Sequence, residues 1–316
     1  MGVRKRCHQL NTLVTGGLGF LGSTISKLLS EKGETVICYD QRSSNGENKQ
    51  SIYNVQGDLR DLPFILETIK NYNVDKIIHT AAISHPYFSR KIPYQTVMIN
   101  AVGTTNIFES ARLTGIKRIV NLSSECVYGN NRELGIITEE APLNPTTPYG
   151  VTKVFTEKMG QVYNNLYGME IISLRPGWIY GPGQFMQCYM KTLLRNAIDG
   201  LPTYEKNGKD YLFQYVHVKD VANACIIAAD VNIPSLQHNV FNITGGNQIS
   251  YGNLVERIKK IFPLAQIEIG GGTIDVLDQN AEFEIRRARE ELGFVPQISL
   301  DEGINEYAKW LEKHEY

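Results

Sequence analysis

A glycine-rich run near the start of the chain constrains the fold more than any other feature of the sequence. Residues 14–22 read Val-Thr-Gly-Gly-Leu-Gly-Phe-Leu-Gly. The apolar stretch 10–14 predicts a strand before it, and the pattern of residues 21–29 predicts a helix directly after it. Glycine at 16, 19 and 22 allows a tight turn and lets the backbone approach a pyrophosphate closely. The run therefore predicts a dinucleotide site, with an ordinary tight turn as the alternative.

The expected phosphate contacts lie where that helix begins. The residues in question are Gly16, Gly19, Phe20, Leu21 and Gly22. The first turn of a helix has backbone N–H groups without intrahelical partners and carries a partial positive charge, and both features favour phosphate.

Strand and helix patterns alternate through the first half of the chain. Strands are predicted at 35–39, 51–55, 76–79, 118–122 and 170–174, and helices at 62–72, 96–114 and 149–167. Short apolar strands that alternate with helices imply crossover connections and a parallel sheet buried on both faces. The predicted fold class is α/β, a doubly wound parallel sheet of the Rossmann type with a smaller, mixed C-terminal substrate lobe. We expect residues 1–175 to form the dinucleotide-binding domain and 176–316 to form mainly the lobe, with some segments returning to the sheet.

Composition narrows the classes of partner. The 316 residues include 32 Lys and Arg against 33 Asp and Glu, so neither nucleic acid nor an anionic membrane is expected as a partner. The basic start has no long apolar stretch behind it, and no run of 18 apolar residues occurs, so neither a signal peptide nor a membrane span is expected. The five cysteines form no C-x-x-C pair and no metal-ligand spacing with the six histidines. This favours reduced thiols in a cytoplasmic protein and no metal site.

Several residues at predicted strand ends favour NAD as the dinucleotide. Asp40 closes the second strand, where a carboxylate accepts both ribose hydroxyls of adenosine and repels a 2′-phosphate. Arg42 leaves NADP as an alternative, and a solvated carboxylate remains possible for Asp40. Asp58 and Leu59 follow the third strand and are expected at the adenine, or else as a cap for the next helix. Ala81 belongs to a run of small residues that lets the backbone approach the cofactor.

A tyrosine and a lysine at helical spacing suggest hydride chemistry. Tyr149 and Lys153 are four residues apart and share one helix face. An ammonium group beside a phenol favours the phenolate, so Tyr149 can take a proton from a substrate hydroxyl while hydride leaves the carbon. Ser123 and Ser124 end the fifth strand, where a hydroxyl can hold the substrate oxygen or simply cap a turn.

Taken in order, these motifs resemble the extended short-chain dehydrogenases/reductases of the NAD-dependent sugar epimerase/dehydratase family. The matching segments are T-G-G-L-G-F-L-G, Asp40, G-D-L-R-D, H-T-A-A, Asn100 in N-A-V-G-T, S-S-E-C-V-Y-G, Y-G-V-T-K, R-P-G-W-I-Y-G-P, V-H-V-K-D-V-A and E-L-G-F-V-P. The resemblance implies a catalytic set of Ser124, Tyr149 and Lys153. It also implies that Ser123, Asn100 and Pro176 lie near the cofactor, that Lys153 binds the nicotinamide ribose, and that the protein forms a homodimer through two long helices, roughly 96–114 and 149–167.

The departures from the family pattern concern the substrate. Sugar dehydratases carry an acidic pair after the serine or threonine, but here Glu125 is followed by Cys126, which disfavours water elimination. Nucleotide-sugar members often carry asparagine at the position of Trp178 and arginine at that of Phe213, and both normally contact the diphosphate. Phenylalanine cannot replace a bidentate, charged contact.

Two interpretations of the substrate therefore stay open. Either it lacks a nucleoside diphosphate, or other cations hold that group, such as Lys191, Arg195 or Lys209. The expected substrate residues are Ser84, His85, Glu125 and Trp178.

The sequence thus predicts NAD-dependent oxidation of a secondary hydroxyl on a sugar or sugar-like substrate. In an epimerase of the nucleotide-sugar type the hydride returns to the substrate. In a net dehydrogenase of a free sugar, sugar acid or other small hydroxy compound the oxidised product leaves. A non-catalytic NAD-sensing regulator is a more distant alternative.

Overall fold

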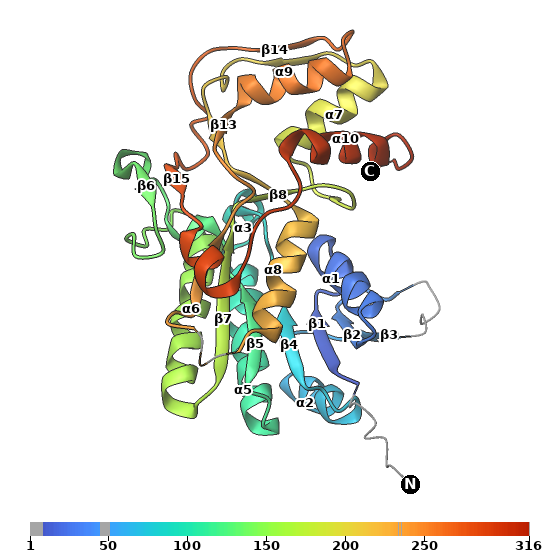
Figure 1. Cartoon of the computed structure of the whole chain (residues 1–316), viewed down its shortest axis with the longest axis vertical. Coiled ribbons are helices and arrows are strands. Elements are labelled where there is room, and N and C mark those ends of the chain that lie inside the picture. Colours follow the sequence, from blue (N-terminus) through green and yellow to red (C-terminus); the bar gives the residue numbers. More distant parts are fainter. Residues whose placement is uncertain (1–8, 45–50, 233, 235, 316) are drawn as a thin grey trace.

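The computed structural model describes residues 9–44, 51–232, 234 and 236–315. The basic start of the chain and Cys7 lie outside these residues. A seven-stranded sheet forms the larger part of the molecule, and a smaller lobe lies above it (Figure 1). The described part of the chain contains no helix long and apolar enough to span a membrane.

The central sheet confirms the predicted doubly wound α/β class. Its order is β12-β7-β5-β4-β1-β2-β3, and every neighbouring pair is parallel. The strands are β1 (Asn11–Thr15), β2 (Thr35–Asp40), β3 (Ile52–Gln56), β4 (Lys76–His79), β5 (Arg118–Leu122), β7 (Glu170–Pro176) and β12 (Val240–Ile243). The chain starts at the middle of the sheet and winds outward in both directions, so the crevice lies where the strand order reverses.

Helices cover both faces of this sheet, and alternate strand residues supply two separate cores. Leu13 and Ile37 face one core, whereas their neighbours Val14 and Val36 face the other. One core is completed by α1 (Phe20–Glu31) and α8 (Val218–Asp230). The other is completed by α2 (Leu62–Asn71), α5 (Gly103–Thr114) and α6 (Pro148–Tyr167). Burial on both faces explains why the strands are continuously apolar in the sequence.

The smaller lobe has its own apolar core, which is rich in tyrosine. Its helices are α7 (Tyr189–Asp199), α9 (Tyr251–Ile261) and α10 (Leu300–Leu311). Its short strands pair as β10 (Leu212–Phe213) with β13 (Ile249–Ser250), and as β9 (Thr203–Glu205) with β14 (Ile267–Ile269). The pair of β8 (Trp178–Tyr180) and β11 (Tyr215–His217) connects the lobe to the sheet.

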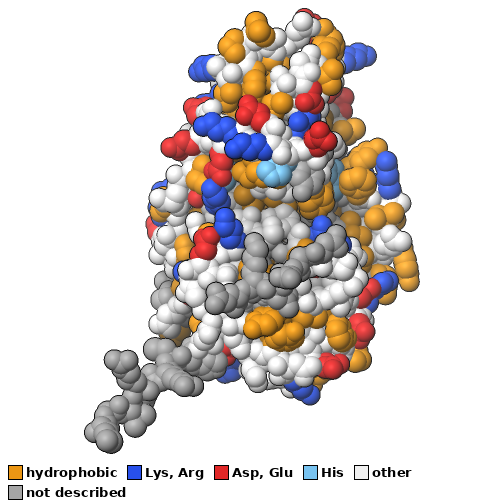
Figure 2. Space-filling view, turned by 90° about the vertical axis from the view of Figure 1, so that its right-hand side faces the viewer, with side chains coloured by type: hydrophobic (Ala, Val, Ile, Leu, Met, Phe, Trp, Pro, Cys, Tyr) orange, Lys and Arg blue, Asp and Glu red, His pale blue; other side chains and the backbone are white. Residues whose placement is uncertain are grey.

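Shorter elements complete the chain. They are α3 (Pro86–Lys91), α4 (Pro93–Thr96), the π-helix η1 (Val97–Val102), the 3-10 turns η2 (Glu125–Val127) and η3 (Arg132–Leu134), the paired strands β6 (Ile136–Ile137) and β15 (Glu282–Phe283), and η5 (Ala288–Leu292). On the face shown in Figure 2, basic and acidic side chains are interspersed, while hydrophobic side chains concentrate in the upper part and along the right-hand edge.

The structure differs from the sequence prediction at two places. The predicted helix 96–114 is divided into the end of α4, the π-helix η1 and α5. Helix α7 was not predicted; it begins after Cys188 without a side-chain cap, so the sequence carries no capping signal at its start.

Candidate active site

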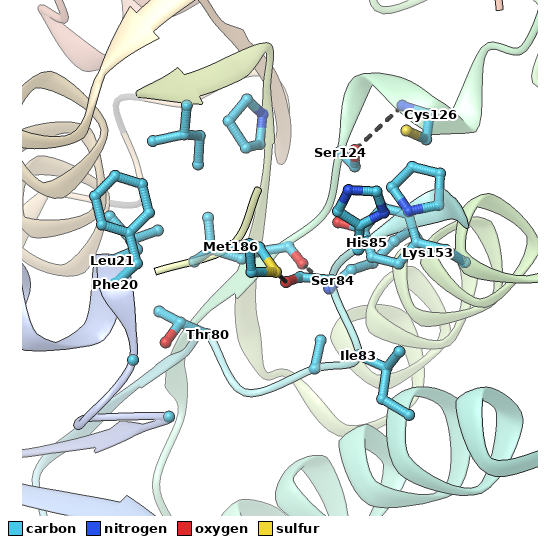
Figure 3. A pocket seen from close by; sticks show the side chains of 18 of the residues that line it. Phe20, Leu21, Thr80, Ile83, Ser84, His85, Ser124, Cys126, Lys153 and Met186 are labelled. Carbon is cyan, nitrogen blue, oxygen red and sulfur yellow. Dashed lines mark hydrogen bonds between the residues drawn. The ribbon is translucent and has the colours of Figure 1, made fainter. Parts of the chain in front are cut away.

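A cavity of about 720 Å³ lies between the carboxyl ends of the sheet strands and the lobe. Every residue expected to bind the cofactor or substrate, or to act in catalysis, lines it, except Asn100. In Figure 3, Phe20 and Leu21 lie on one side of this cavity, and Ser124, His85 and Lys153 lie together on the other. The parallel arrangement produces this convergence, since each strand ends at the same edge of the sheet.

The glycine run forms a closely packed turn between β1 and α1. Gly16 has a φ of 68°, its N–H donates to the carbonyl oxygen of Tyr39 at 2.7 Å, and its own carbonyl accepts the N–H of Gly19 at 2.8 Å. A Cβ on Gly22 would lie 2.0 Å from the Gly16 carbonyl oxygen. No side chain caps α1, which begins at Phe20, so its first N–H groups are available at the cavity wall.

Asp40 closes β2 beside this turn and is buried. One carboxylate oxygen accepts the N–H of Leu18 at 3.2 Å, and the other accepts the backbone N–H and Nε of Arg42 at 3.0 and 3.2 Å. The Arg42 guanidinium also lies over the Phe185 ring, 5.7 Å from its centroid. Arg42 is therefore already paired with a carboxylate, which weakens the alternative that it receives a 2′-phosphate.

The remaining cofactor-side residues lie along the same wall. The Asp58 carboxylate is held by Arg60, whose hydrogen bonds lower the Asp58 pKa. Helix α2 is capped by Asp61, which accepts the N–H of Phe64 at 3.0 Å. Ala81 contacts the turn so closely that a Cβ on Gly16 would lie 2.9 Å from its Cα.

The two serines after β5 have different surroundings. Ser123 donates to Glu157, which also receives two hydrogen bonds from the Arg175 guanidinium at 2.9 and 2.6 Å. Ser124 accepts the N–H of Cys126 at 3.2 Å, so it caps η2 while its side chain lines the cavity (Figure 3). Ser123 is thus part of a buried network behind the cavity wall, and Ser124 is the serine available to a substrate.

Tyr149 and Lys153 lie on α6, whose start is set by Thr147. The Thr147 side chain accepts the N–H of Gly150 at 3.1 Å, and Pro148 occupies the first helical position. The Lys153 ammonium nitrogen is 5.6 Å from the centre of the Tyr149 ring and donates to the carbonyl of Leu122 at 2.5 Å. The predicted pair therefore meets at the end of β5.

Burial changes the pKa of both groups. It lowers the Lys153 pKa to about 8, against the opposing effect of the Glu157 carboxylate. It raises the Tyr149 pKa, while a hydrogen bond with the Ser124 side chain acts in the opposite direction. This differs from the expectation that lysine alone favours the phenolate, because removal of a phenol from water penalises its charged form more strongly.

Glu125, one of the expected substrate residues, lies in this wall as a buried carboxyl group. It is 7 % exposed, and its Oε2 has no hydrogen-bond partner among the described residues. Burial, together with the charge of Asp278, raises its pKa to about 8. The sequence did not indicate Asp278, which follows Glu125 by 153 residues (278 − 125) and lines the cavity from the second half of the chain. Its carboxylate accepts the Thr146 hydroxyl at 2.7 Å.

The lobe side of the cavity is built from aromatic and apolar side chains. Trp178 packs edge-on against Phe213, with ring centres 5.1 Å apart, and Tyr189 packs on the same Phe213 ring at 5.4 Å. Met186 extends across to Ser84, with Sδ 4.0 Å from the hydroxyl oxygen (Figure 3). Pro176 ends β7 at the base of this wall.

Asn100 does not line the cavity, in contrast to its expected cofactor contact. It is 1 % exposed, and its amide accepts the N–H of Ile83 at 2.8 Å and donates to the Thr152 hydroxyl at 3.1 Å. In the structure, Asn100 holds the backbone at Ile83 against α6. His79 is also a packed residue, with its ring nitrogens 2.7 and 2.8 Å from two threonine hydroxyls.

The three cations suggested as diphosphate contacts lie elsewhere. Lys191 is fully buried and donates to the carbonyl of Phe185 at 2.9 Å. Arg195 donates to the carbonyls of Leu311 and His314 at 2.8 and 2.5 Å. Lys209 is absent from the described cavity wall as well. None of the three lines the cavity, because Lys191 and Arg195 are held within the lobe and Lys209 is exposed outside the cavity.

Comparison with known proteins places this site in a family. The model of the "NAD dependent epimerase/dehydratase family" matches residues 12–244, which span the glycine turn, both serines, Tyr149 and Lys153. The chain belongs to the NAD-dependent epimerase/dehydratase family. It is therefore an NAD-dependent enzyme of this type, as the sequence motifs predicted.

Similar proteins cover nearly the whole chain. A putative UDP-glucose 4-epimerase of Methanocaldococcus jannaschii is 31% identical, over 96% of this chain and 98% of its own. A UDP-glucose 4-epimerase from Brucella ovis, solved with NAD, has a TM-score of 0.86 at 26% identity, covering 96% of this chain and 98% of its own. A UDP-glucose 4-epimerase of Thermotoga maritima shares the fold, with a TM-score of 0.88 at 24% identity over 96% of this chain and 99% of its own.

The residues of the cavity fit NAD. The glycine turn is packed too closely to accept side chains at positions 16 and 22, and the uncapped start of α1 supplies N–H groups for a pyrophosphate. Asp40 lies at the end of β2, where ribose hydroxyls are recognised in folds of this type. Lys153, beside Tyr149, lies across the cavity from this turn.

Proposed function

We propose that this family member oxidises a secondary hydroxyl of a sugar or sugar-like substrate and returns the hydride, as a 4-epimerase does. The observation that carries the proposal is the convergence of Ser124, Tyr149 and Lys153 in the same cavity as the glycine turn. The similarity to proteins described as UDP-glucose 4-epimerases supports the epimerase outcome.

Each catalytic side chain has a distinct task in this proposal. Ser124 holds the substrate oxygen, and the Tyr149 phenolate takes the hydroxyl proton as hydride leaves the same carbon. Lys153 stabilises the phenolate, because its ammonium lies beside that ring. NAD, when bound, accepts the hydride and adds positive charge near the phenol. Among the other predicted residues, we assign the cofactor to the glycine turn, Asp40, Asp58, Leu59, Ala81, Ser123 and Pro176, and the substrate to Ser84, His85, Glu125 and Trp178.

Absorbance at 340 nm during turnover tests this proposal. With a panel of nucleotide-sugars, free sugars and sugar acids, an epimerase converts substrate without net NADH, and Tyr149→Phe abolishes conversion. Steady accumulation of NADH would instead identify a net dehydrogenase. A Tyr149→Phe variant that kept full biological activity would favour a non-catalytic NAD sensor.

We further propose a cytoplasmic homodimer, with residues 1–175 as the cofactor half and 176–316 as mainly the substrate half. The dimer is supported by an exposed apolar face on α6, where Val151, Phe155, Val162 and Leu166 are 52%, 41%, 43% and 68% exposed. Side chains of this kind commonly mark a protein–protein interface. Sedimentation of the wild type and of Leu166→Glu tests this, since the variant should be a monomer.

A further inference from the structure

The lobe side of the cavity is suited to an uncharged, partly apolar ligand. Trp178, Tyr189 and Tyr211 line it, and all three contact the fully buried ring of Phe213. Aromatic side chains held by such packing present flat apolar faces at little entropic cost. This wall is therefore fixed in shape before a ligand arrives.

The catalytic side of the cavity adds carboxyl groups to that aromatic wall. Glu125 has an oxygen without a partner among the described residues, and Asp278 lies close enough to affect its charge. Asp278 itself is held by the Thr146 hydroxyl and, through its backbone carbonyl, by the Tyr211 phenol at 2.9 Å. A sugar hydroxyl both donates and accepts hydrogen bonds, so it satisfies Glu125 in either protonation state. An anion gains a hydrogen bond only from the protonated form of Glu125, and the charge of Asp278 opposes its binding.

The charged residues that line the cavity also favour an uncharged ligand. Among the described lining residues from the second half of the chain, none is Lys or Arg, and the one charged group there is Asp278. The cations that do line the described wall belong to the first half: Arg42, Arg90 and Lys153. Arg42 is paired with Asp40 and Lys153 lies beside Tyr149, so exposed Arg90 is the cation left for a substrate phosphate. Tight diphosphate sites normally use several charge-assisted hydrogen bonds.

We propose that the substrate is a neutral sugar or glycoside with an apolar group at its anomeric end, and that the site does not recognise a nucleoside diphosphate. The apolar group packs against Trp178 and Tyr189, and the sugar hydroxyls meet Ser124 and Glu125. This proposal rests on the proposed function for its chemistry, but it concerns the part of the substrate that does not react.

Binding to the full-length, NAD-loaded protein tests the proposal by calorimetry. The probes are phenyl β-D-glucopyranoside, phenyl β-D-galactopyranoside, UDP-glucose and UDP. We expect at least one phenyl glycoside to bind ten times or more tightly than UDP-glucose, and UDP not to displace it. UDP-glucose binding tighter than both phenyl glycosides would overturn the proposal, as would displacement of the glycoside by UDP.

Two variants locate the contact. Trp178→Leu should weaken phenyl glycoside binding about tenfold while the melting temperature and NAD affinity stay at wild-type values. Tyr204→Leu is the matched control, because Tyr204 is a lobe aromatic that is 64% exposed and does not line the cavity. Equal losses in the two variants would contradict the assigned wall.

Arg90→Gln tests whether Arg90 binds the diphosphate of a nucleotide-sugar. The weak binding of UDP-glucose should change less than twofold, whereas a tenfold loss would place a diphosphate at Arg90 and overturn the proposal. Turnover distinguishes this inference from the proposed function. If UDP-glucose is converted with dependence on Tyr149, the proposed function stands and the neutral substrate is refuted. If a phenyl glycoside binds tightly but no sugar gives Tyr149-dependent chemistry, the proposed function fails instead.

Discussion

Replacement of Gly22 by alanine tests the packing of the cofactor turn. The added Cβ would lie 2.0 Å from the carbonyl oxygen of Gly16 and 3.0 Å from the Cα of Gly17. Unstrained contacts between heavy atoms need about 3.5 Å, so the Gly16 peptide has to move by more than ~1 Å. That movement breaks two hydrogen bonds, from Gly16 N–H to Tyr39 at 2.7 Å and from Gly19 N–H to Gly16 at 2.8 Å.

The size of the effect follows from three contributions. Two lost hydrogen bonds cost about 2 kcal/mol, and overpacking adds about 1–3 kcal/mol. Alanine is a better helix former than glycine by about 1 kcal/mol, which offsets part of this cost. We therefore expect the free energy of unfolding to fall by about 2–4 kcal/mol. We also expect NAD affinity to fall at least tenfold, or about 1.4 kcal/mol, because the displaced peptides form the pyrophosphate cradle.

Urea denaturation and NAD titration of Gly22→Ala measure the two effects. Gly271→Ala is the matched control, since nothing lies within 4 Å of a Cβ at that position. An alanine variant at 22 with wild-type stability and an NAD affinity within threefold of wild type would refute the packing argument.

Three further predictions concern buried charges. Glu157→Leu leaves the buried Arg175 guanidinium without its carboxylate partner, so the free energy of unfolding measured in urea should fall by about 3–5 kcal/mol. The double variant with Arg175→Met should recover most of that loss. An equal loss in the single and the double variant would contradict this prediction. The Glu125 carboxyl has a pKa of about 8 in the folded chain against 4.5 ordinarily, so wild-type stability should fall as pH rises from 4.5 to 8, and Glu125→Gln should remove that fall. The Lys153 pKa is about 8 in the folded chain against 10.5 ordinarily. Lys153→Met should therefore be more stable than the wild type at pH 7 and should lose that advantage between pH 8 and 10.5. A gain in stability that does not depend on pH would argue against burial of the charge.

Local sequence patterns predicted the sheet and its cofactor edge well. The strands 76–79 and 118–122 were predicted with the bounds that the structure has, because each is a short apolar run between clear helix or turn signals. The glycine turn was predictable for a similar reason, since three glycines between a strand and a helix have few other conformational explanations.

Contacts between distant segments were harder to predict. Nothing in the local sequence brings Asp278 to Glu125, and that meeting depends on how the chain returns from the lobe. A lysine is usually exposed, so the sequence also carried no sign that the fold buries Lys191 completely. The division of the helix at 97–102 into a π-turn also has no local signal, because it arises where that segment packs against α6.

The order in which the chain builds the lobe limits how the protein can be divided or recombined. Strands β8 to β10 enter the lobe, and α8 and β12 return to the large sheet. Strands β13 and β14 enter the lobe again, β15 and η5 return to the large domain, and α10 ends in the lobe. A fragment that ends at residue 175 would lack α8 and would uncover Ile25 and Leu29 on α1, which pack into the core with that helix. The lobe is therefore no transferable module, and new substrate preferences in such a protein must arise by substitutions within the cavity wall rather than by exchange of one contiguous segment.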